Sequence, residues 1–182
     1  LDEALGKLNN KYIDIVISTH TDLDHMGGLI EVARRYDIGT FVSNGRKGTS
    51  DATKALQKTL AERNIPELVL LAGDSIRYGG NTLAVLSPDR TLVRSKDVNE
   101  AGLVTRLTAG SPSGSTTALF TADIGFPTET VLLEKKIDLA SDILKVGHHG
   151  SKNSSSENFL AAVRPTISVI GVGAKNSYGH PT

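Results

Sequence analysis

Two kinds of hydrophobic pattern alternate along the chain. Short runs rich in β-branched residues predict strands over residues 12–18, 40–43, 68–71, 82–86, 103–108, 118–121, 142–146 and 167–172. Apolar residues spaced three or four positions apart predict helices over residues 27–36, 50–64, 128–135 and 159–163. Ser154 and Glu157 fit a capping box ahead of the last of these helices. Turn residues between the central strands predict antiparallel pairing there, so we expect an α/β chain with two sheets covered by helices.

Composition narrows the class of protein. The 182 residues carry 20 basic and 20 acidic side chains, which argues against coating of nucleic acid or anionic membrane by bulk positive charge. The absence of cysteine excludes a disulfide scaffold, a cysteine nucleophile and a thiolate-ligated metal or iron–sulfur site. The longest apolar runs, such as residues 68–72, are far shorter than the roughly 18 residues that predict a membrane span. Length and the lack of a linker predict a single domain over residues 1–182.

All five histidines lie in three short blocks, and each block follows a predicted strand. The first block, HTDLDHMGG, holds His20, Asp22, Asp24 and His25. Imidazole together with carboxylate suits zinc, manganese or iron, and the spacing allows the first two residues to share one ion and the last two to face a second. The alternative is that an aspartate merely caps the following helix, which would not require two histidines.

The chain supplies a further carboxylate and two further histidines at later strand ends. The apolar strand LFTAD ends in Asp123, which is either a turn residue or a carboxylate that bridges two metals. The segment LKVGHHGS places His148 and His149 in a Gly/Ser loop. The KNSSS run that follows offers donors and a helix start suited to a phosphate, or is only a polar loop with a helix cap.

The last histidine lies in the loop sequence NSYGHP. His180 is open to three interpretations there: a metal ligand, a general acid for a leaving oxygen, or a phosphate contact. Asn176 and Tyr178 of the same loop are candidates for substrate binding, and the plainer interpretation of both is an ordinary surface loop.

These motifs resemble the metallo-β-lactamase fold family, because HTDLDHMGG, the strand-terminal Asp123 and HHGS occur in matching order. With NSYGHP added, the combination looks most like the C-terminal hydrolase domain of ComEC-type competence proteins, which are bacterial DNA-uptake membrane channels. The resemblance implies a four-layer αββα sandwich of two mixed β-sheets flanked by helices. Members of the family carry a β region before the first motif and more structure after the last histidine, so we expect this domain to be incomplete at both ends.

The resemblance also implies one or two divalent metal ions. Three side chains would hold one ion, two would hold the other and one would bridge them: Asp24, His25 and His149; His20 and Asp22; and Asp123. His149 is preferred to His148 because its His-Gly-Ser loop resembles the His-x-Ser loop of related nucleases. Two departures put oxygen where imidazole is common: Asp22 replaces the second histidine of HxHxDH, and Asn99 lies near the place of another histidine. Manganese therefore joins zinc as the expected metal.

We expect a metal-dependent hydrolase, foremost a phosphodiesterase or nuclease that acts on DNA through a metal-bound hydroxide, in bacterial DNA uptake. Asp24 would orient the nucleophile as well as bind metal, and His180 or His148 would protonate or stabilise the leaving alkoxide. The expected substrate contacts are Ser151, Asn176 and Tyr178.

Two other functions stay open from the sequence. The first is hydrolysis of a small acyl substrate such as a lactone, thioester or β-lactam, and the second is a catalytically weak module that guides or docks DNA. The expected partners are nucleic acid, as single-stranded DNA, and membrane channel domains of the same polypeptide. By resemblance the domain is extracytoplasmic in a bacterial membrane protein, and a soluble cytoplasmic hydrolase is the alternative.

Overall fold

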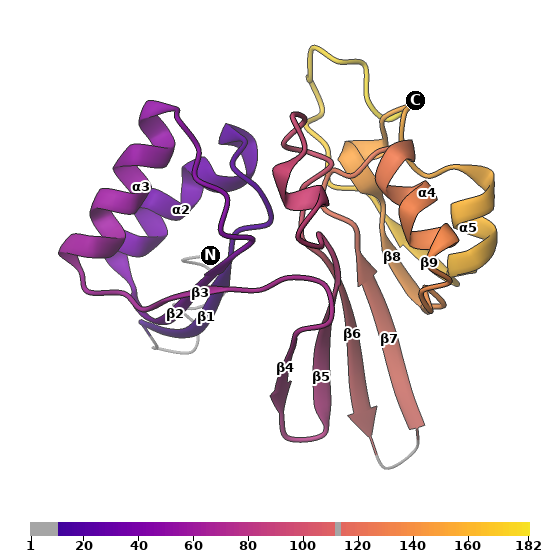
Figure 1. The fold of residues 1–182 in the computed structure, drawn as a ribbon, viewed down its shortest axis with the longest axis horizontal. Coiled ribbons are helices and arrows are strands. Elements are labelled where there is room, and N and C mark those ends of the chain that lie inside the picture. The colour runs from indigo at the N-terminus through magenta and orange to yellow at the C-terminus, as the bar shows by residue number, and fades with distance from the viewer. Residues whose placement is uncertain (1–10, 112–113) are drawn as a thin grey trace. The chain divides into compact units, whose positions relative to one another are not determined.

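The computed structural model describes residues 11–111 and 114–182. The chain divides into two compact units, a first unit up to Val69 and a second unit from Leu70 to Thr182. Within the described residues, each unit contains one β-sheet, two α-helices and a hydrophobic core of its own (Figure 1). The expected α/β class with two sheets flanked by helices is therefore confirmed, and the single domain over residues 1–182 stays a prediction.

In the first unit, strands and helices alternate. They are β1 (Tyr12–Ile17), α2 (Leu23–Arg35), β2 (Asp37–Ser43), α3 (Asp51–Glu62) and β3 (Glu67–Val69). The strands pair in the order β1-β2-β3, and both pairs are parallel, so within the described residues this sheet is parallel rather than mixed as expected. The helices pack on the sheet through apolar residues such as Met26, Phe41 and Leu60. Helix α3 begins at its cap Ser50, whose hydroxyl accepts the backbone N–H of Thr53 at 3.2 Å.

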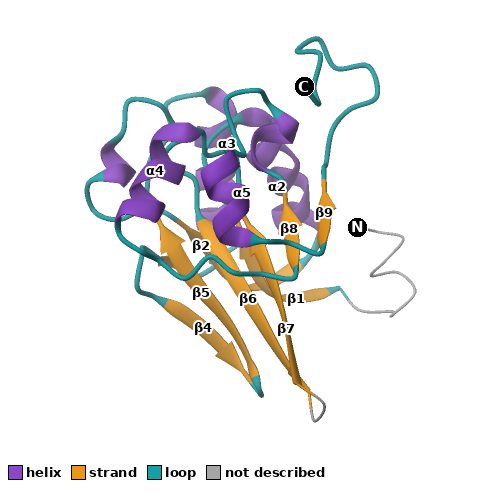
Figure 2. Cartoon of the chain, turned by 90° about the vertical axis from the view of Figure 1, so that its right-hand side faces the viewer, coloured by secondary structure: helices purple, strands orange, loops and turns teal. Residues whose placement is uncertain are grey.

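The second unit is built on a six-stranded mixed sheet. Its elements are β4 (Ser75–Tyr78), β5 (Asn81–Ser87), η1 (Leu92–Arg94), β6 (Val104–Ser111), β7 (Gly114–Phe120), α4 (Phe126–Glu134), β8 (Ile143–Lys145), η2 (Gly147–Gly150), α5 (Glu157–Val163) and β9 (Ile167–Val169). The strands follow one another in chain order, antiparallel from β4 to β7 and parallel from β7 to β9. Helices α4 and α5 cover one face of this sheet (Figure 2), and Leu132 and Phe159 pack there against Leu119 and Leu144.

The parallel pairing of β7 and β8 decides where two loops of the second unit lie. Phe120 and Lys145 are paired at the carboxyl ends of these strands, so the loops that follow both strands leave the sheet at the same edge. The backbone N–H of His148 donates to the carbonyl of Ala122 at 3.2 Å, which joins the two loops directly. Asp123 and the histidines of η2 are consequently neighbours, although Asp123 and His148 are 25 positions apart in the sequence.

Three local predictions were wrong in an informative way. Helix α2 begins at Leu23 instead of residue 27, because Leu23 and buried Met26 continue the apolar spacing of Leu29 one turn further toward the N-terminus than the prediction placed it. Strand β4 was missed, since it is a short, mostly exposed edge strand. The cap of α5 is Ser156, whose hydroxyl accepts the N–H of Phe159 at 3.3 Å. Ser154, predicted to form the capping box, instead donates its hydroxyl to the carbonyl of Gly147 or Ser151.

In the part of the chain that the structure describes, the helices are all too short or too polar to span a lipid bilayer.

Candidate metal centre

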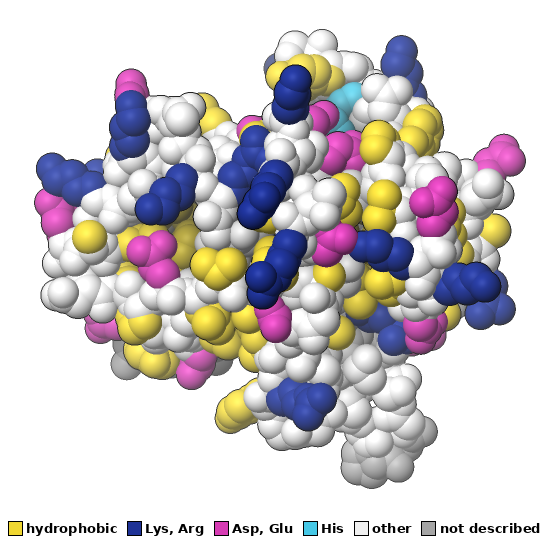
Figure 3. Space-filling view, in the orientation of Figure 1, with side chains coloured by type: hydrophobic (Ala, Val, Ile, Leu, Met, Phe, Trp, Pro, Cys, Tyr) yellow, Lys and Arg dark blue, Asp and Glu magenta, His cyan; other side chains and the backbone are white. Residues whose placement is uncertain are grey.

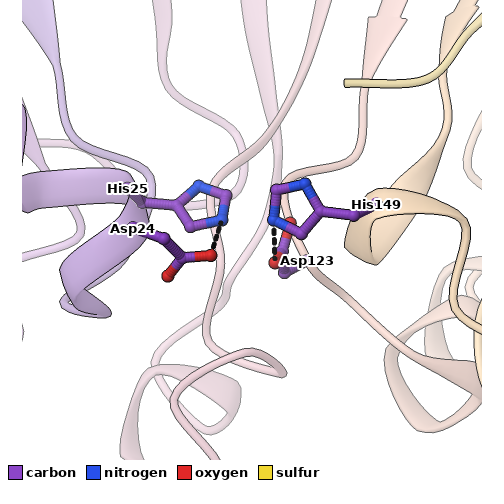
Figure 4. A group of neighbouring side chains, drawn as sticks. All are labelled: Asp24, His25, Asp123 and His149. Carbon is purple, nitrogen blue, oxygen red and sulfur yellow. Dashed lines mark ion pairs between the residues drawn. The ribbon is translucent and has the colours of Figure 1, made fainter. Parts of the chain in front are cut away.

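The first unit gathers two histidines and two aspartates where β1 leads into α2. The Nε2 atom of His20 lies 4.0 Å from Oδ2 of Asp22, and Nε2 of His25 lies 3.7 Å from Oδ2 of Asp24 (Figure 4). The two imidazole rings are adjacent, with centroids 4.1 Å apart. All four residues of the HTDLDH motif are thus brought together, as their spacing predicted.

The loop that carries these residues is fixed by its own backbone. The N–H of Ser18 donates to the carbonyl of Val42, which extends the β1–β2 pairing by one residue, and the Ser18 hydroxyl donates to the carbonyl of His20. His20 is buried, and its Nδ1 lies 3.0 Å from the hydroxyl of Thr19. An imidazole held at one nitrogen presents the other nitrogen in a fixed direction, which is how histidine ligands of metals are usually oriented.

Side-chain helix capping does not account for Asp22 of the motif. Asp22 occupies the N-cap position of α2, but within the described residues its side chain makes no capping hydrogen bond. Its backbone carbonyl does accept from the N–H groups of His25 and Met26. The plainer alternative, an aspartate present only to cap the helix, is therefore not what the structure contains at this position.

The second unit holds a matching pair of an imidazole and a carboxylate. Nε2 of His149 lies 3.2 Å from Oδ2 of Asp123 (Figure 4), and the Asp123 side chain is only 4 % exposed. Nδ1 of His149 lies 2.6 Å from the carbonyl oxygen of Gly171. Because a carbonyl oxygen can only accept, Nδ1 must carry the proton in this bond. Nδ1 is therefore the donor to Gly171, and Nε2 is the ring nitrogen that pairs with the Asp123 carboxylate.

Backbone conformation in these loops is unusual. His148 and His149 have φ values of 46° and 54°, and Ala122, directly before Asp123, has a φ of 48°. Residues with a side chain pay a conformational cost in this left-handed region, and such strain is common where a site must aim particular side chains. The strain places adjacent histidines at the edge of the sheet where Asp123 also lies.

Two glutamates that sequence reasoning missed hold these loops in place. Both carboxylate oxygens of buried Glu129 accept backbone N–H groups, from Ser155 and from Ser156 at 2.9 Å. Both carboxylate oxygens of Glu100 accept likewise, from Gly125 at 3.1 Å and from Thr128 at 2.9 Å. Glu129 thereby fixes the segment after η2, and Glu100 fixes the segment after Asp123.

The same contacts answer the expectation of a phosphate site at the start of α5. The N–H groups of Ser155 and Ser156, which such a phosphate would use, are bound to the Glu129 carboxylate. The N–H of Phe159 is bound to the Ser156 hydroxyl. That phosphate hypothesis is wrong for these three donors, and the KNSSS run serves as a loop and cap here.

Lys145 is a second feature that the sequence did not single out. Its ammonium group donates to the carbonyl of Val146 at 2.8 Å. Burial lowers the pKa of this lysine, and the nearby carboxylate of Asp123 opposes that shift. A half-buried cation therefore contributes positive potential on the Asp123 side of the loop.

The expected substrate contacts differ in what the structure leaves them free to do. Ser151 is buried, and its hydroxyl accepts a hydrogen bond from the backbone N–H of Asn153. The amide group of Asn176 is occupied by the backbone of its own loop. Tyr178 is exposed and stacks on His180, with ring centroids 5.8 Å apart. Of these three, Tyr178 alone presents a whole side chain to a ligand.

The order of the motifs and the two imidazole–carboxylate pairs agree with a comparison of the sequence with a protein-family model. The family model described as metallo-beta-lactamase superfamily matches residues 2–173. The chain belongs to the metallo-β-lactamase superfamily. Members of this superfamily are in general metal-dependent hydrolases, and the family predicted from the sequence motifs is confirmed.

Two relatives show which group within the superfamily the chain is similar to. The chain is 31 % identical over 172 residues to ComE operon protein 3 of Bacillus subtilis (strain 168), covering 94 % of this chain and 21 % of the relative. It is 25 % identical over 169 residues to Recombination protein 2 of Haemophilus influenzae (strain ATCC 51907 / DSM 11121 / KW20 / Rd), covering 93 % of this chain and 19 % of the relative. The predicted similarity to ComEC-type competence proteins is confirmed, and the chain spans about a fifth of the length of these relatives.

Solved structures support the superfamily fold. The diiron β-hydroxylase CmlA from Streptomyces venezuelae superposes with a TM-score of 0.53 at 12 % identity, covering 87 % of this chain and 35 % of that chain. At this identity the likeness concerns the fold alone.

Residues of this superfamily member fit a divalent cation in each unit. Each unit pairs an imidazole nitrogen with a carboxylate oxygen, the ligand types that zinc and manganese share. The Oδ1 atom of Asn99 is shielded from solvent and has no hydrogen-bond partner among the described residues, so an amide oxygen is a third kind of candidate ligand atom, close to the Asp123 loop. The closeness follows from Gly102, beside which the Asn99 carbonyl and the Asp123 N–H both lie.

Proposed function

We propose that the chain is a metal-dependent phosphodiesterase that cleaves single-stranded DNA. The observation that carries the proposal is the His149–Asp123 pair, in which the proton of His149 is committed to Gly171 and Nε2 faces a buried carboxylate at 3.2 Å. A buried carboxylate paired with an imidazole is a ligand set suited to a divalent cation. The relative named Recombination protein 2 supports DNA as the polymer that is cleaved.

The proposed ligands are those that the resemblance to the superfamily implies. One ion would take Asp24, His25 and His149, a second would take His20 and Asp22, and Asp123 would bridge the two. A bound divalent ion supplies Lewis-acid chemistry, since it lowers the pKa of water and offsets the negative charge of phosphoryl oxygens. Asp22 and Asn99 are oxygen donors where the superfamily commonly has histidine, which favours manganese over zinc for the second ion.

Side chains of the second unit are proposed to handle the proton of the leaving group. The Nδ1 atom of His180 is shielded and has no hydrogen-bond partner within the described residues. Its ring meets His148 edge to face, with centroids 6.0 Å apart. We assign proton delivery to the leaving oxygen to His180 or His148, and orientation of the attacking water to Asp24. Lys145 adds positive potential that favours a phosphodiester over a neutral ester.

The setting of the activity is proposed from the relatives, because this chain corresponds to about a fifth of their length. We propose that the domain works on DNA during uptake, beside membrane channel domains of the same polypeptide and on the extracytoplasmic side. On the face shown in Figure 3, Lys and Arg side chains are interspersed with Asp and Glu, so a broad basic surface is not what attracts DNA there. The metal would supply the positive charge at the scissile phosphate.

A substrate panel tests this function against its alternatives. Protein stripped with a chelator is supplied with manganese, zinc or magnesium and assayed on a single-stranded DNA oligomer, a bis-aryl phosphate, a lactone, a thioester and a β-lactam. We expect cleavage of the DNA and the bis-aryl phosphate with at least one metal, none in chelator, and little acyl hydrolysis. Faster turnover of an acyl substrate would contradict the proposal, as would DNA binding without cleavage under every metal.

A further inference from the structure

We infer that Tyr178 is a stacking platform for an unpaired nucleobase, which makes single-stranded DNA the form of substrate that this site selects. The inference deepens the proposed function and rests on it for the identity of the polymer. Three ring side chains lie at the edge of the second unit, and hydrogen bonds of the chain fix the loop that carries two of them.

The ring of Tyr178 is offered to solvent. The residue is 80 % exposed, whereas a tyrosine ring is more often largely buried because it carries a large apolar area. The ring is not loose, since it stacks on His180 with an angle of 14° between the two planes. His180 in turn meets His148 edge to face. The three rings form a row that ends at His148, the chain neighbour of the proposed ligand His149.

The loop that holds this row is tied together by a single amide group. Oδ1 of Asn176 accepts the N–H groups of Tyr178 and His180, at 3.2 and 3.0 Å. Nδ2 of Asn176 donates to the carbonyls of Gly173 and His180, at 2.9 and 2.8 Å. Asn176 is thus a positioning residue for the ring row.

The end of the same loop is fixed to η2. The N–H of Thr182 donates to the carbonyl of Gly150 at 2.9 Å. Pro181 lies so close to Gly150 that a Cβ at that glycine would come within 2.8 Å of the proline ring. The platform is therefore mounted on the segment that also carries His148 and His149, and a ligand would find it ordered in advance.

An exposed, ordered aromatic face suits a base that has left a duplex. Every nucleobase has a π-face, so stacking on an aromatic side chain binds single strands with little sequence preference. Bases of a duplex are already stacked on each other and must be unstacked at a cost before they can reach a side chain. Because acidic and basic side chains are mixed on the face in Figure 3, stacking would supply affinity that bulk charge does not.

The chain offers a clean reporter for this contact. It contains no tryptophan, so a Tyr178→Trp variant has one indole, whose emission is quenched when a base stacks on it. The matched control is Tyr78→Trp, because Tyr78 is 85 % exposed at the β4–β5 turn, at the opposite end of the sheet from the loop after β7 (Figure 1). The probes are a thymidylate 12-mer and an abasic 12-mer of equal phosphate number, added in chelator so that no cleavage occurs.

We expect the thymidylate oligomer to quench the Tyr178→Trp variant, and both the abasic oligomer and the Tyr78→Trp control to show no such loss of emission. In a companion titration, Tyr178→Ala should weaken binding of the thymidylate oligomer by about 5- to 150-fold, the equivalent of the usual stacking contribution per base. Tyr178→Phe should retain the affinity. No quenching, or equal quenching of both tryptophan variants, would overturn the inference.

Failure of the platform can be told apart from failure of the proposed function. Metal-dependent cleavage of DNA by the unaltered protein, without selective quenching, would contradict the stacking role of Tyr178 and support the proposed phosphodiesterase activity. Selective quenching without cleavage under any metal would contradict the phosphodiesterase activity and support a surface that binds unpaired bases.

Discussion

Replacement of Asp123 by alanine is expected to lower metal-dependent cleavage of single-stranded DNA by about 100- to 1000-fold, because metal ligation supplies several kcal/mol of transition-state stabilisation. The carboxylate is almost fully shielded, and its Oδ2 lies 3.2 Å from Nε2 of His149. Rates are measured at saturating manganese and again with zinc.

The same substitution separates function from stability. Thermal unfolding of the metal-free Asp123→Ala protein is measured beside the rates, so that a slower reaction can be told apart from a smaller fraction of folded protein. The matched control is Asp138→Asn, an exposed aspartate of the same unit that pairs with Arg106 at 3.3 Å, and its rate should match that of the unaltered protein. Full activity in Asp123→Ala would remove this residue from the metal centre.

Replacement of Glu129 by alanine is expected to lower the free energy of unfolding by about 2–4 kcal/mol, because it leaves two backbone N–H groups without their acceptor in a shielded place. Glu129→Gln keeps one acceptor oxygen and should lose less, about 1–2 kcal/mol. Urea unfolding in chelator measures both, so that metal binding does not contribute. The substitution should also weaken metal affinity by about 10- to 100-fold, as loss of a residue that supports a metal ligand usually does.

The control for Glu129 lies in the same helix. Glu134 is exposed near the end of α4, and Glu134→Ala should change stability by no more than about 0.5 kcal/mol. If Glu129→Ala proved as stable as Glu134→Ala, the loop after η2 would not depend on the Glu129 carboxylate. If stability fell but metal affinity did not, Glu129 would support the fold without positioning His149.

Local chemistry made part of this structure predictable from the sequence. Ligand types packed into HTDLDH, and histidines that follow strands, indicated where metal chemistry would concentrate. Asp22 and His25 are only three positions apart, so their spacing in the sequence is enough to predict that they lie close together. The amphipathic spacing of α3 is likewise a local pattern. Ser50, a residue type that favours the N-cap position, caps that helix.

Other parts were not predictable because they depend on contacts between distant segments. Glu129 lies in a helical stretch where a charged residue is expected to face solvent, and its partners Ser155 and Ser156 follow about 26 residues later. Asn176 looks like a ligand-binding amide until its four backbone bonds are seen. Pairing of this kind leaves no periodic trace in a single sequence.

The central claim is that Asp24 and Asp123 are ligands of the metal that cleavage requires, and the most direct test measures bound metal and DNA cleavage in the same samples. Chelator-stripped protein is dialysed against manganese or zinc, and metal content is set against the cleavage rate for the unaltered protein, Asp24→Ala and Asp123→Ala. The account predicts tightly bound metal whose amount tracks the rate, and loss of both on either substitution. Undiminished cleavage in chelator, or metal and cleavage that survive both substitutions, would contradict it.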